Sequence, residues 1–171
     1  MDHTSELREK FEQCVEACAD SMYRVAFRLT GNATLARELV QESYLSAWRS
    51  IGSLEDPKKM RSWMFAILRN QHTKLIRSEK KSVATSEAIE TASETPDNTR
   101  IQIQETVQAA VSELDDKHRM AILLVSMEGL SVEEAAKVLD VPRGTVLSRL
   151  SRGREKLKSI LIQKQIHLAS E

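Results

Sequence analysis

The apolar residues near the start of the chain recur every three or four positions, which places them on one side of a long helix. They are Leu7, Phe11, Cys14, Cys18, Met22, Val25 and Leu29. Gly31 ends this predicted helix, and Asn32 can cap a second helix that runs to about Ser50. The apolar positions of the second helix are Leu35, Leu39, Leu45 and Trp48. Strand-type alternation is absent from the sequence, so we predict an all-α fold.

A third helix is predicted from Asp56 to about Glu79, because Asp56 is a good capping residue and Pro57 suits the first helical turn. The segment that follows is rich in Ser, Thr, Ala and Glu and has almost no apolar periodicity, which is typical of a flexible linker. We therefore predict a first domain at residues 1–81, a linker at 82–101 and a second domain at 102–171.

The second domain also reads as helical. One helix has its apolar positions at Ile103, Val107, Ala110, Val111 and Leu114. Asp115 and Asp116 can cap the next helix, which Gly129 ends. Ser131 and Glu134 fit a capping box at the start of a short third helix.

A last helix is predicted from about Gly144 to Gln165, after a turn at Asp140 to Pro142. A short helix, a tight turn and a longer basic helix form the pattern of a helix-turn-helix, whose second helix enters the major groove of DNA. Val146 and Leu150 would then face back onto the domain. Taken alone, this helix fits equally a charged amphipathic helix without DNA contact.

The net charge of the chain is +0, so no overall basic excess indicates a nucleic-acid partner. The basic residues nevertheless gather in two blocks. Residues 58–81 hold eight Lys or Arg against one acid, and residues 143–164 hold seven against one. Each block can attract phosphate locally although the total is zero, and each fits a solvated charged face if taken alone.

The sequence offers little for catalysis. Cys14 and Cys18 lie one helical turn apart without further ligands at metal-site spacing, which favours packing in the core over redox or metal use. The histidines are scattered, and we expect them in solvent or in local hydrogen bonds: His3, His72, His118 and His167. With no nucleotide-binding loop, metal cluster or nucleophile–base pair, we predict no enzymatic activity, no catalytic residue, no metal and no cofactor.

No apolar run approaches the roughly 20 residues needed to cross a bilayer, and the polar N-terminus lacks the apolar segment of a signal peptide. We therefore expect a cytoplasmic protein without membrane insertion.

Three segments resemble the extracytoplasmic-function (ECF) sigma factors of bacterial RNA polymerase, in the family's order and spacing. The run PRGTVLSRLSRGREKL at residues 142–157 is similar to the family's −35 recognition helix. LTG at 29–31, ARELVQE at 36–42 and AW at 47–48 resemble its first conserved segment, and RSWMFAILRN at 61–70 resembles its second. Only the linker and both termini lie outside these matches.

The resemblance implies a promoter-specificity subunit. Its first domain would bind core RNA polymerase and the −10 element, and its second domain would bind the −35 element. In the family, the second helix docks on the clamp helices of the largest polymerase subunit. The corresponding positions here are Glu38, Leu39, Val40, Gln41 and Glu42, with Glu38 in place of the usual Asp. The resemblance also implies an anti-sigma factor that covers one or both of the polymerase- and DNA-binding surfaces.

The loop at residues 53–60 and the basic helix after it correspond to the family's −10 recognition and strand-opening surface. A flipped base needs a pocket there, and cations can follow the phosphates of the opened strand. The candidates are Lys58, Lys59, Arg61, Arg69, Asn70, Lys74 and Arg77. Asn70 fits either a base contact or a local backbone cap. The spacing of Trp63 to Ile67 favours core packing over base stacking.

The −35 candidates lie in the last helix and would meet bases or phosphates of the major groove. They are Arg143, Thr145, Ser148, Arg149, Ser151, Arg152 and Arg154. Leu147 occupies a position where many family members carry Lys or Arg, so one polar contact is absent or replaced by an apolar one. Asp140 stands in the turn where Gly is common, and Asp tolerates the left-handed backbone that such a turn needs.

Two other classes of function remain. A sigma-like protein could titrate an anti-sigma factor without touching DNA, but a decoy has no need for both basic blocks or for Arg149 and Arg152. A stand-alone helix-turn-helix repressor would need its own dimer interface and would leave the first domain without a role.

Overall fold

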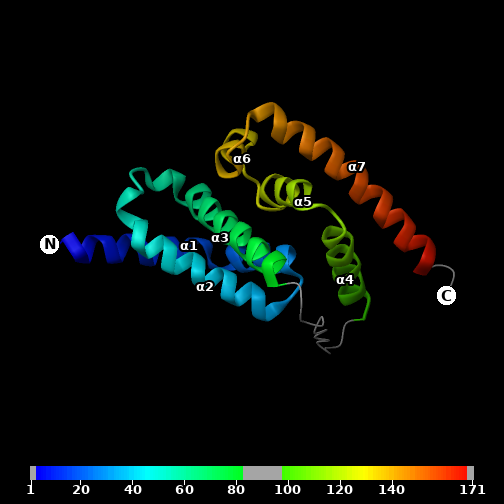
Figure 1. The fold of residues 1–171 in the computed structure, drawn as a ribbon, viewed down its shortest axis with the longest axis horizontal. Helices are drawn as coiled ribbons and strands as arrows, with labels where there is room; N and C mark the ends of the chain where they lie inside the picture. The colour runs from blue at the N-terminus through cyan, green and yellow to red at the C-terminus, as the bar shows by residue number, and fades with distance from the viewer. Residues whose placement is uncertain (1–2, 83–97, 169–171) are drawn as a thin grey trace.

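The computed structural model describes residues 3–82 and 98–168, and within these ranges every regular element is helical, which confirms the all-α prediction (Figure 1). Helices α1 (His3–Thr30), α2 (Ala33–Ser50) and α3 (Met60–Ser82) pack against one another and form the N-terminal bundle. Helices α4 (Asn98–Ser112), α5 (Asp116–Ile122), α6 (Val132–Leu139) and α7 (Arg143–Leu168) form the C-terminal bundle.

The predicted helix starts in the N-terminal bundle have the expected caps. The Asn32 side chain accepts hydrogen bonds from the backbone nitrogens of Thr34 and Leu35 at 2.8 and 3.1 Å. Asp56 caps a short 3₁₀ turn, η2 (Pro57–Lys59), and α3 follows it directly. A second 3₁₀ turn, η1 (Ile51–Ser53), ends α2. The loop expected to recognise a base, residues 53–60, therefore includes η2, and only residues 54–56 lie between the two turns.

The core of the N-terminal bundle includes both cysteines, as the apolar spacing predicts. Cys14 and Cys18 are fully buried beside Met22 and Phe65. Burial raises the pKa of both thiols, which disfavours the reactive thiolate. The two side chains thus behave as small apolar groups in this structure.

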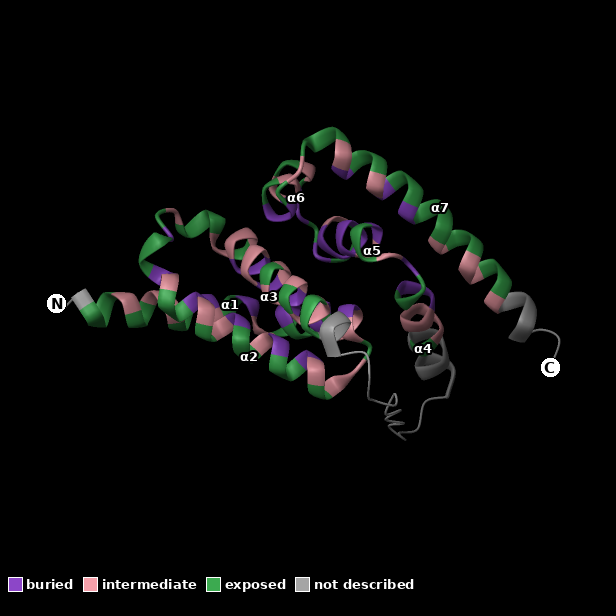
Figure 2. Cartoon of the chain, in the orientation of Figure 1, coloured by how far each residue is buried: buried purple, intermediate pink, exposed green. Residues whose placement is uncertain are grey.

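In the C-terminal bundle, α7 contacts α4, α5 and α6. A π-helical turn, η3 (Leu123–Met127), follows α5, and the loop after it contains Gly129, which has a positive φ of 71°. Figure 2 shows α5 largely buried and the outer side of α7 exposed. Helix α4 begins inside the segment predicted as a linker, whereas residues 83–97 of that segment lie outside the described residues.

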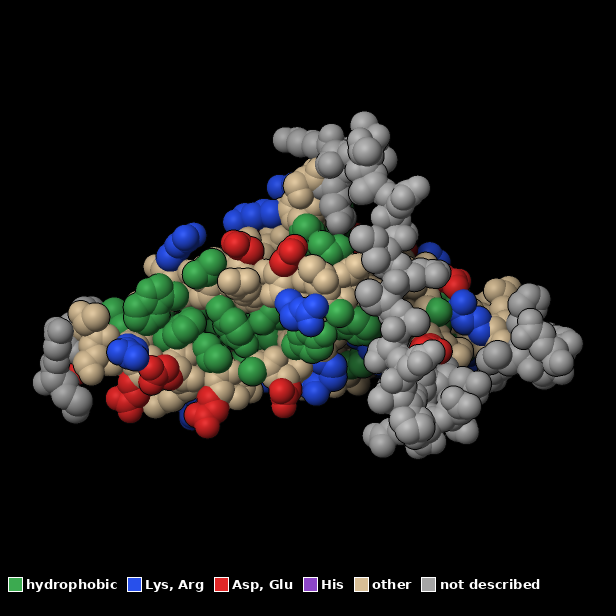
Figure 3. Space-filling view, turned by 90° about the horizontal axis from the view of Figure 1, so that it is seen from below, with side chains coloured by type: hydrophobic (Ala, Val, Ile, Leu, Met, Phe, Trp, Pro, Cys, Tyr) green, Lys and Arg blue, Asp and Glu red, His purple; other side chains and the backbone are tan. Residues whose placement is uncertain are grey.

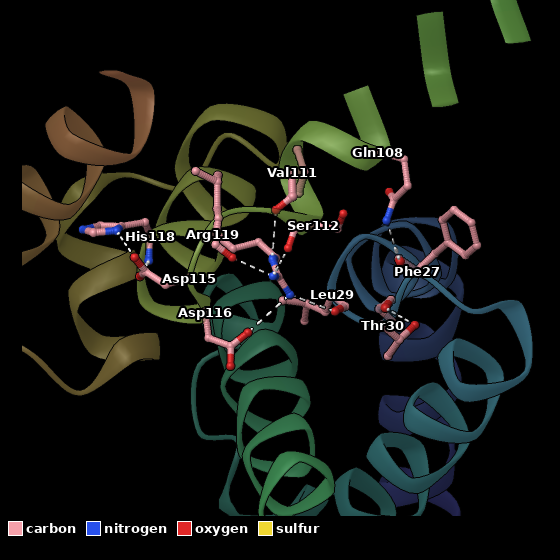
Figure 4. A network of polar contacts seen from close by, with 12 residues as sticks. Phe27, Leu29, Thr30, Gln108, Val111, Ser112, Asp115, Asp116, His118 and Arg119 are labelled. Atoms are coloured by element: carbon pink, nitrogen blue, oxygen red, sulfur yellow. Dashed lines mark hydrogen bonds and ion pairs between the residues drawn. The ribbon is translucent and has the colours of Figure 1, made fainter. Parts of the chain in front are cut away.

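The two bundles contact each other through α3 and α6, and through α1 with α4 and α5. Arg119 of α5 is central to the second contact (Figure 4). Its guanidinium donates to the carbonyl oxygens of Val111 and Ser112 in the last turn of α4 and of Leu114 just after it. It also donates to the Leu29 carbonyl of α1 at 3.1 Å. Arg119 thus donates to carbonyl groups at the ends of two helices, α1 and α4.

Candidate DNA and polymerase interfaces

Helices α6 and α7 have the geometry of a helix-turn-helix. The Ser131 hydroxyl accepts from the Glu134 backbone nitrogen at 3.2 Å, and the Glu134 carboxylate accepts from the Ser131 nitrogen at 2.8 Å. The Ser131 hydroxyl also donates to the Glu134 carboxylate at 2.8 Å, and this bond, together with the one from the Ser131 nitrogen, lowers the pKa of Glu134. Asp140 adopts the left-handed backbone at φ 53° between the helices. Both the capping box and the left-handed turn agree with the sequence predictions.

The two sides of α7 differ as predicted. Val146 and Leu150 are buried against the bundle. Most of the −35 candidates are on the exposed side: Arg143, Ser148, Ser151, Arg152 and Arg154 are exposed, and Thr145 and Arg149 are half-buried. Leu147 is also exposed, at 48%. An apolar side chain therefore lies on the surface that would face DNA.

Several of these candidates already have polar partners within the chain. The guanidinium of Arg143 pairs with the Glu133 carboxylate at 2.8 Å, and that of Arg154 donates to the Ser126 hydroxyl at 3.2 Å. Arg149 lines a cleft of about 370 Å³ between the bundles, together with Arg69, Arg77 and others. Arginines predicted to contact the −10 element, Arg69 and Arg77, therefore line the same cleft as Arg149, which is predicted to contact the −35 element.

The −10 candidates lie on and before α3. Lys58, Lys59, Arg61, Asn70, Lys74 and Arg77 are exposed, and Arg69 is half-buried. The loop before α3 opens onto a pocket of about 220 Å³, lined on one side by Ser53, Asp56 and Trp63. Trp63 also packs against the core, so its side chain both supports the loop and lines the pocket. Asn70 accepts a hydrogen bond from Arg69 at 3.1 Å.

Two of the −10 candidates are engaged by the C-terminal bundle. Arg61 Nη2 donates to Glu128 Oε2 at 2.8 Å, and Arg69 Nη2 donates to the Leu139 carbonyl at 3.1 Å. Glu128 also accepts from Arg24 of α1. The sequence did not predict a role for Glu128 or Arg24. They are 104 positions apart and form their pair only in the folded chain.

The polymerase-docking candidates lie on α2. Glu38, Gln41 and Glu42 are exposed and Val40 is half-buried, but Leu39 is buried in the core and supports the helix from below. Leu45 and Trp48, expected among the apolar positions of the helix, are each 43% exposed. With Phe11, Tyr23, Val40 and Tyr44 they line an apolar groove, and Figure 3 shows hydrophobic side chains gathered on this face of the N-terminal bundle.

The rings around this groove are held in place by one another. The Phe11 and Trp48 rings meet edge to face with centroids 5.3 Å apart, and the Phe11 and Tyr44 rings do so at 6.4 Å. Exposed aromatic groups next to acidic and amide side chains are typical of the apolar centre and polar rim of protein-binding surfaces.

One histidine agrees with the expectation and one does not, and the side chains of His3 and His167 lie outside the described residues. His118 has a local hydrogen bond, from Nδ1 to the Asp115 carboxylate at 2.7 Å. His72, by contrast, is buried between the bundles rather than in solvent, and this burial lowers its pKa. Among the residues that the structure describes, no three potential metal ligands come together.

An exposed basic recognition helix beside a second bundle with its own cationic surface defines a two-part helix-turn-helix protein. Comparisons with known proteins make the class specific. The family model for Sigma-70 region 2 matches residues 14–82, and the model for Sigma-70 region 4 matches residues 104–157.

Two relatives match over most of their length. The ECF RNA polymerase sigma factor EcfG of Rhodopseudomonas palustris is 32% identical over 157 residues, which span 91% of this chain and 87% of that protein. SigW of Bacillus subtilis, also an ECF sigma factor, is 29% identical over 168 residues and 90% of both chains. The chain therefore belongs to the ECF sigma factors, which are transcription initiation factors and not enzymes.

Two solved structures share the fold. The sigma factor RpoE of Bartonella quintana, in complex with the anti-sigma factor NepR, superposes with a TM-score of 0.78 at 29% identity, covering 88% of this chain and 96% of that one. CnrH, in complex with the cytosolic domain of CnrY, superposes with a TM-score of 0.68 at 25% identity, covering 90% and 88%. No helix in the described part of the chain has the length and apolar character to cross a membrane.

Proposed function

We propose that this chain binds core RNA polymerase in the cytoplasm and directs it to promoters with defined −10 and −35 elements. The observation that carries the proposal is the helix-turn-helix at α6 and α7, whose exposed face holds Arg and Ser side chains while Val146 and Leu150 anchor it. Membership of the ECF sigma factors supports both parts of the proposal.

The −35 element would be read by α7. Guanidinium groups of Arg149 and Arg152 can donate to guanine edges or to phosphates, and the hydroxyls of Thr145, Ser148 and Ser151 can contact either. Arg143 and Arg154, at the two ends of this surface, suit phosphate contacts.

The −10 element would be opened and read on the N-terminal bundle. The pocket beside the loop of residues 53–60 can take an unstacked base, with Trp63 in its wall. Lys58, Lys74 and Arg77 can follow the phosphates, and so can Lys59 if it leaves its ion pair with Asp56. Arg61 and Arg69 would join them once released from the C-terminal bundle.

Polymerase would dock on α2. Glu38, Gln41 and Glu42 provide the polar rim, and the groove at Val40, Leu45 and Trp48 provides the apolar centre. The structural relative bound to the anti-sigma factor NepR supports a further proposal, that an anti-sigma factor holds this chain inactive.

We also propose that the two bundles are separate domains, at residues 1–81 and 102–171, with a linker at 82–101. The separate matches of the two family models, at residues 14–82 and 104–157, support this division.

The test is run-off transcription with core polymerase and purified chain across the promoters of the source genome. We expect transcripts that start at a discrete set of promoters sharing −10 and −35 sequences. If no promoter supports initiation, the chain is not a working sigma factor. A chain that instead releases another sigma factor from its anti-sigma factor would be the decoy considered above.

A further inference from the structure

We propose that Glu128 is an interdomain latch that keeps the −10 surface covered, and that promoter binding requires its contacts with Arg24 and Arg61 to break. This inference rests on the proposed function, because it concerns access to the −10 surface. Glu128 lies in the loop between η3 and α6, Arg24 lies on α1, and Arg61 lies on α3. One carboxylate therefore joins the C-terminal bundle to two helices of the N-terminal bundle.

The geometry of the latch is that of a doubly paired carboxylate. Arg24 donates through Nε to Oε1 at 3.1 Å and through Nη2 to Oε2 at 3.2 Å, and Arg61 donates through Nη2 to Oε2 at 2.8 Å. The Arg61 guanidinium also lies over the Phe65 ring, 5.7 Å from its centroid. Charge-assisted pairs of this kind are short and directional, so they fix the position of the C-terminal bundle.

Burial makes the latch asymmetric. The Glu128 side chain is 1% exposed, whereas Arg24 and Arg61 are 54% and 46% exposed. The carboxylate has left water and depends on the two arginines, but the arginines remain hydrated without it. When the bundles separate, Glu128 returns to water and its desolvation cost is recovered. The polar contacts that Glu128 adds to the interface can therefore be replaced by solvent when the bundles separate.

The latch covers the surface that single-stranded DNA would use. The Glu128 carboxylate binds Arg61 at the position where a phosphate oxygen would bind. Arg69 donates to the Leu139 carbonyl at the end of α6. The pocket proposed for a flipped base is closed on its other side by Lys137 and Val138 of α6. Arg61 cannot bind a phosphate at this position while it is paired with Glu128. DNA binding and the closed arrangement therefore compete.

The experiment compares four full-length chains: wild type, Glu128→Gln, Arg24→Ala and Glu113→Gln. Glu113 is the matched control, since it is also an acid of the C-terminal bundle but forms an exposed ion pair with Lys164. Arg24→Ala breaks the latch from the other bundle and leaves every proposed DNA contact in place. Circular dichroism and thermal melting show that each variant is folded.

Two readouts are measured on each chain. Small-angle X-ray scattering gives the radius of gyration without DNA, and fluorescence anisotropy gives the affinity for a labelled single-stranded oligonucleotide of promoter −10 sequence. We expect Glu128→Gln and Arg24→Ala to enlarge the radius of gyration and to bind the oligonucleotide about tenfold more tightly, which is the gain when the competent fraction rises from about a tenth to most molecules. Glu113→Gln should match wild type in both.

The proposal is overturned if both latch variants stay as compact as wild type, or if they open without binding the oligonucleotide more tightly. These outcomes are distinct from a failure of the proposed function. Scattering needs no promoter or polymerase, so opening can be seen even if wild type fails to start transcription.

Discussion

Single side chains decide how closely α7 packs on α5. Gly153 is buried, and a Cβ at this position would lie 2.9 Å from Ile122 Cδ1 and 3.3 Å from His118 Cβ. The helix needs a small residue at this contact so that the recognition surface sits at its observed distance from the core.

We expect Gly153→Ala to lower the free energy of unfolding by about 1–3 kcal/mol relative to Gly144→Ala, because added atoms in a packed core force its neighbours apart. Gly144 is the matched control, since its Cβ would meet nothing within 4 Å on the same helix. Urea unfolding of both variants measures the difference. Equal midpoints would mean that Ile122 moves aside without cost.

The lowered pKa of Asp115 predicts a contribution to stability that depends on pH. Burial alone would raise its pKa, but hydrogen bonds from Lys156 and His118 lower it from 3.8 to about 2. A carboxyl whose pKa is depressed by folding contributes stability above its unfolded pKa and loses it as pH falls through the folded value. Asp115→Asn should therefore lower the urea midpoint at pH 7, and the deficit should shrink between about pH 4 and pH 2. A deficit that does not change with pH would assign the effect to the helix cap alone.

At the scale of elements, the recognition helix has an unusual position at Leu147. This side chain is 48% exposed among the Arg and Ser residues that would face DNA. An apolar group there offers no phosphate contact and no hydrogen bond to a base edge, although it can contact a thymine methyl group.

Leu147→Lys should therefore tighten binding to −35 promoter DNA and raise the salt dependence by about one released counterion. Ile162→Lys is the matched control, because Ile162 is a similarly exposed apolar residue, at 46%, farther along α7. The affinity of each variant for −35 promoter DNA, measured over a range of salt concentrations, shows whether the two substitutions differ. The same gain in both variants would indicate a general charge effect and remove Leu147 from the reading surface.

Helix α2 shows how an element can be identified correctly while the role of its apolar side chains is not. Its length and its Asn32 cap agree with the sequence. Leu39 points into the core, but Leu45 and Trp48 lie at the surface. Spacing shows which residues share a side of a helix, but the surfaces available to cover that side depend on the neighbouring helices.

Trp48→Ala should reduce binding to core polymerase by at least about tenfold, because aromatic residues at the centre of an interface carry much of its energy. Charge reversal at Glu42 should also weaken binding without unfolding the chain. Met127→Ala is the control, since Met127 is exposed but lies on the other bundle. Co-purification with polymerase and a titration with labelled core measure the effect. Unchanged binding by both α2 variants would move the docking surface elsewhere.

At the scale of the whole molecule, the charge distribution has two consequences. The chain has a net charge of +0, yet its cations gather on α3 and α7. In the closed arrangement, Glu128 neutralises Arg61, and Arg69 donates a hydrogen bond to the carbonyl of Leu139. A neutral chain can therefore carry two phosphate-binding surfaces and still keep one of them covered.

The sequence alone determined the features that depend on neighbouring residues. The caps at Asn32, Asp56 and Ser131 and the left-handed Asp140 follow from hydrogen bonds and backbone preferences within a few residues. The inward side of α7 follows from helical periodicity. For the same reason, the motifs of the family are visible without a structure.

The tertiary structure alone decided the features that join distant segments. Glu128 meets Arg61 and Arg24 across 67 and 104 residues, and His72 is buried only because the C-terminal bundle covers it. An acid near a helix end looks the same in sequence whether it faces water or two guanidinium groups. Its burial depends on which surfaces meet after the chain folds, and no local pattern contains that information.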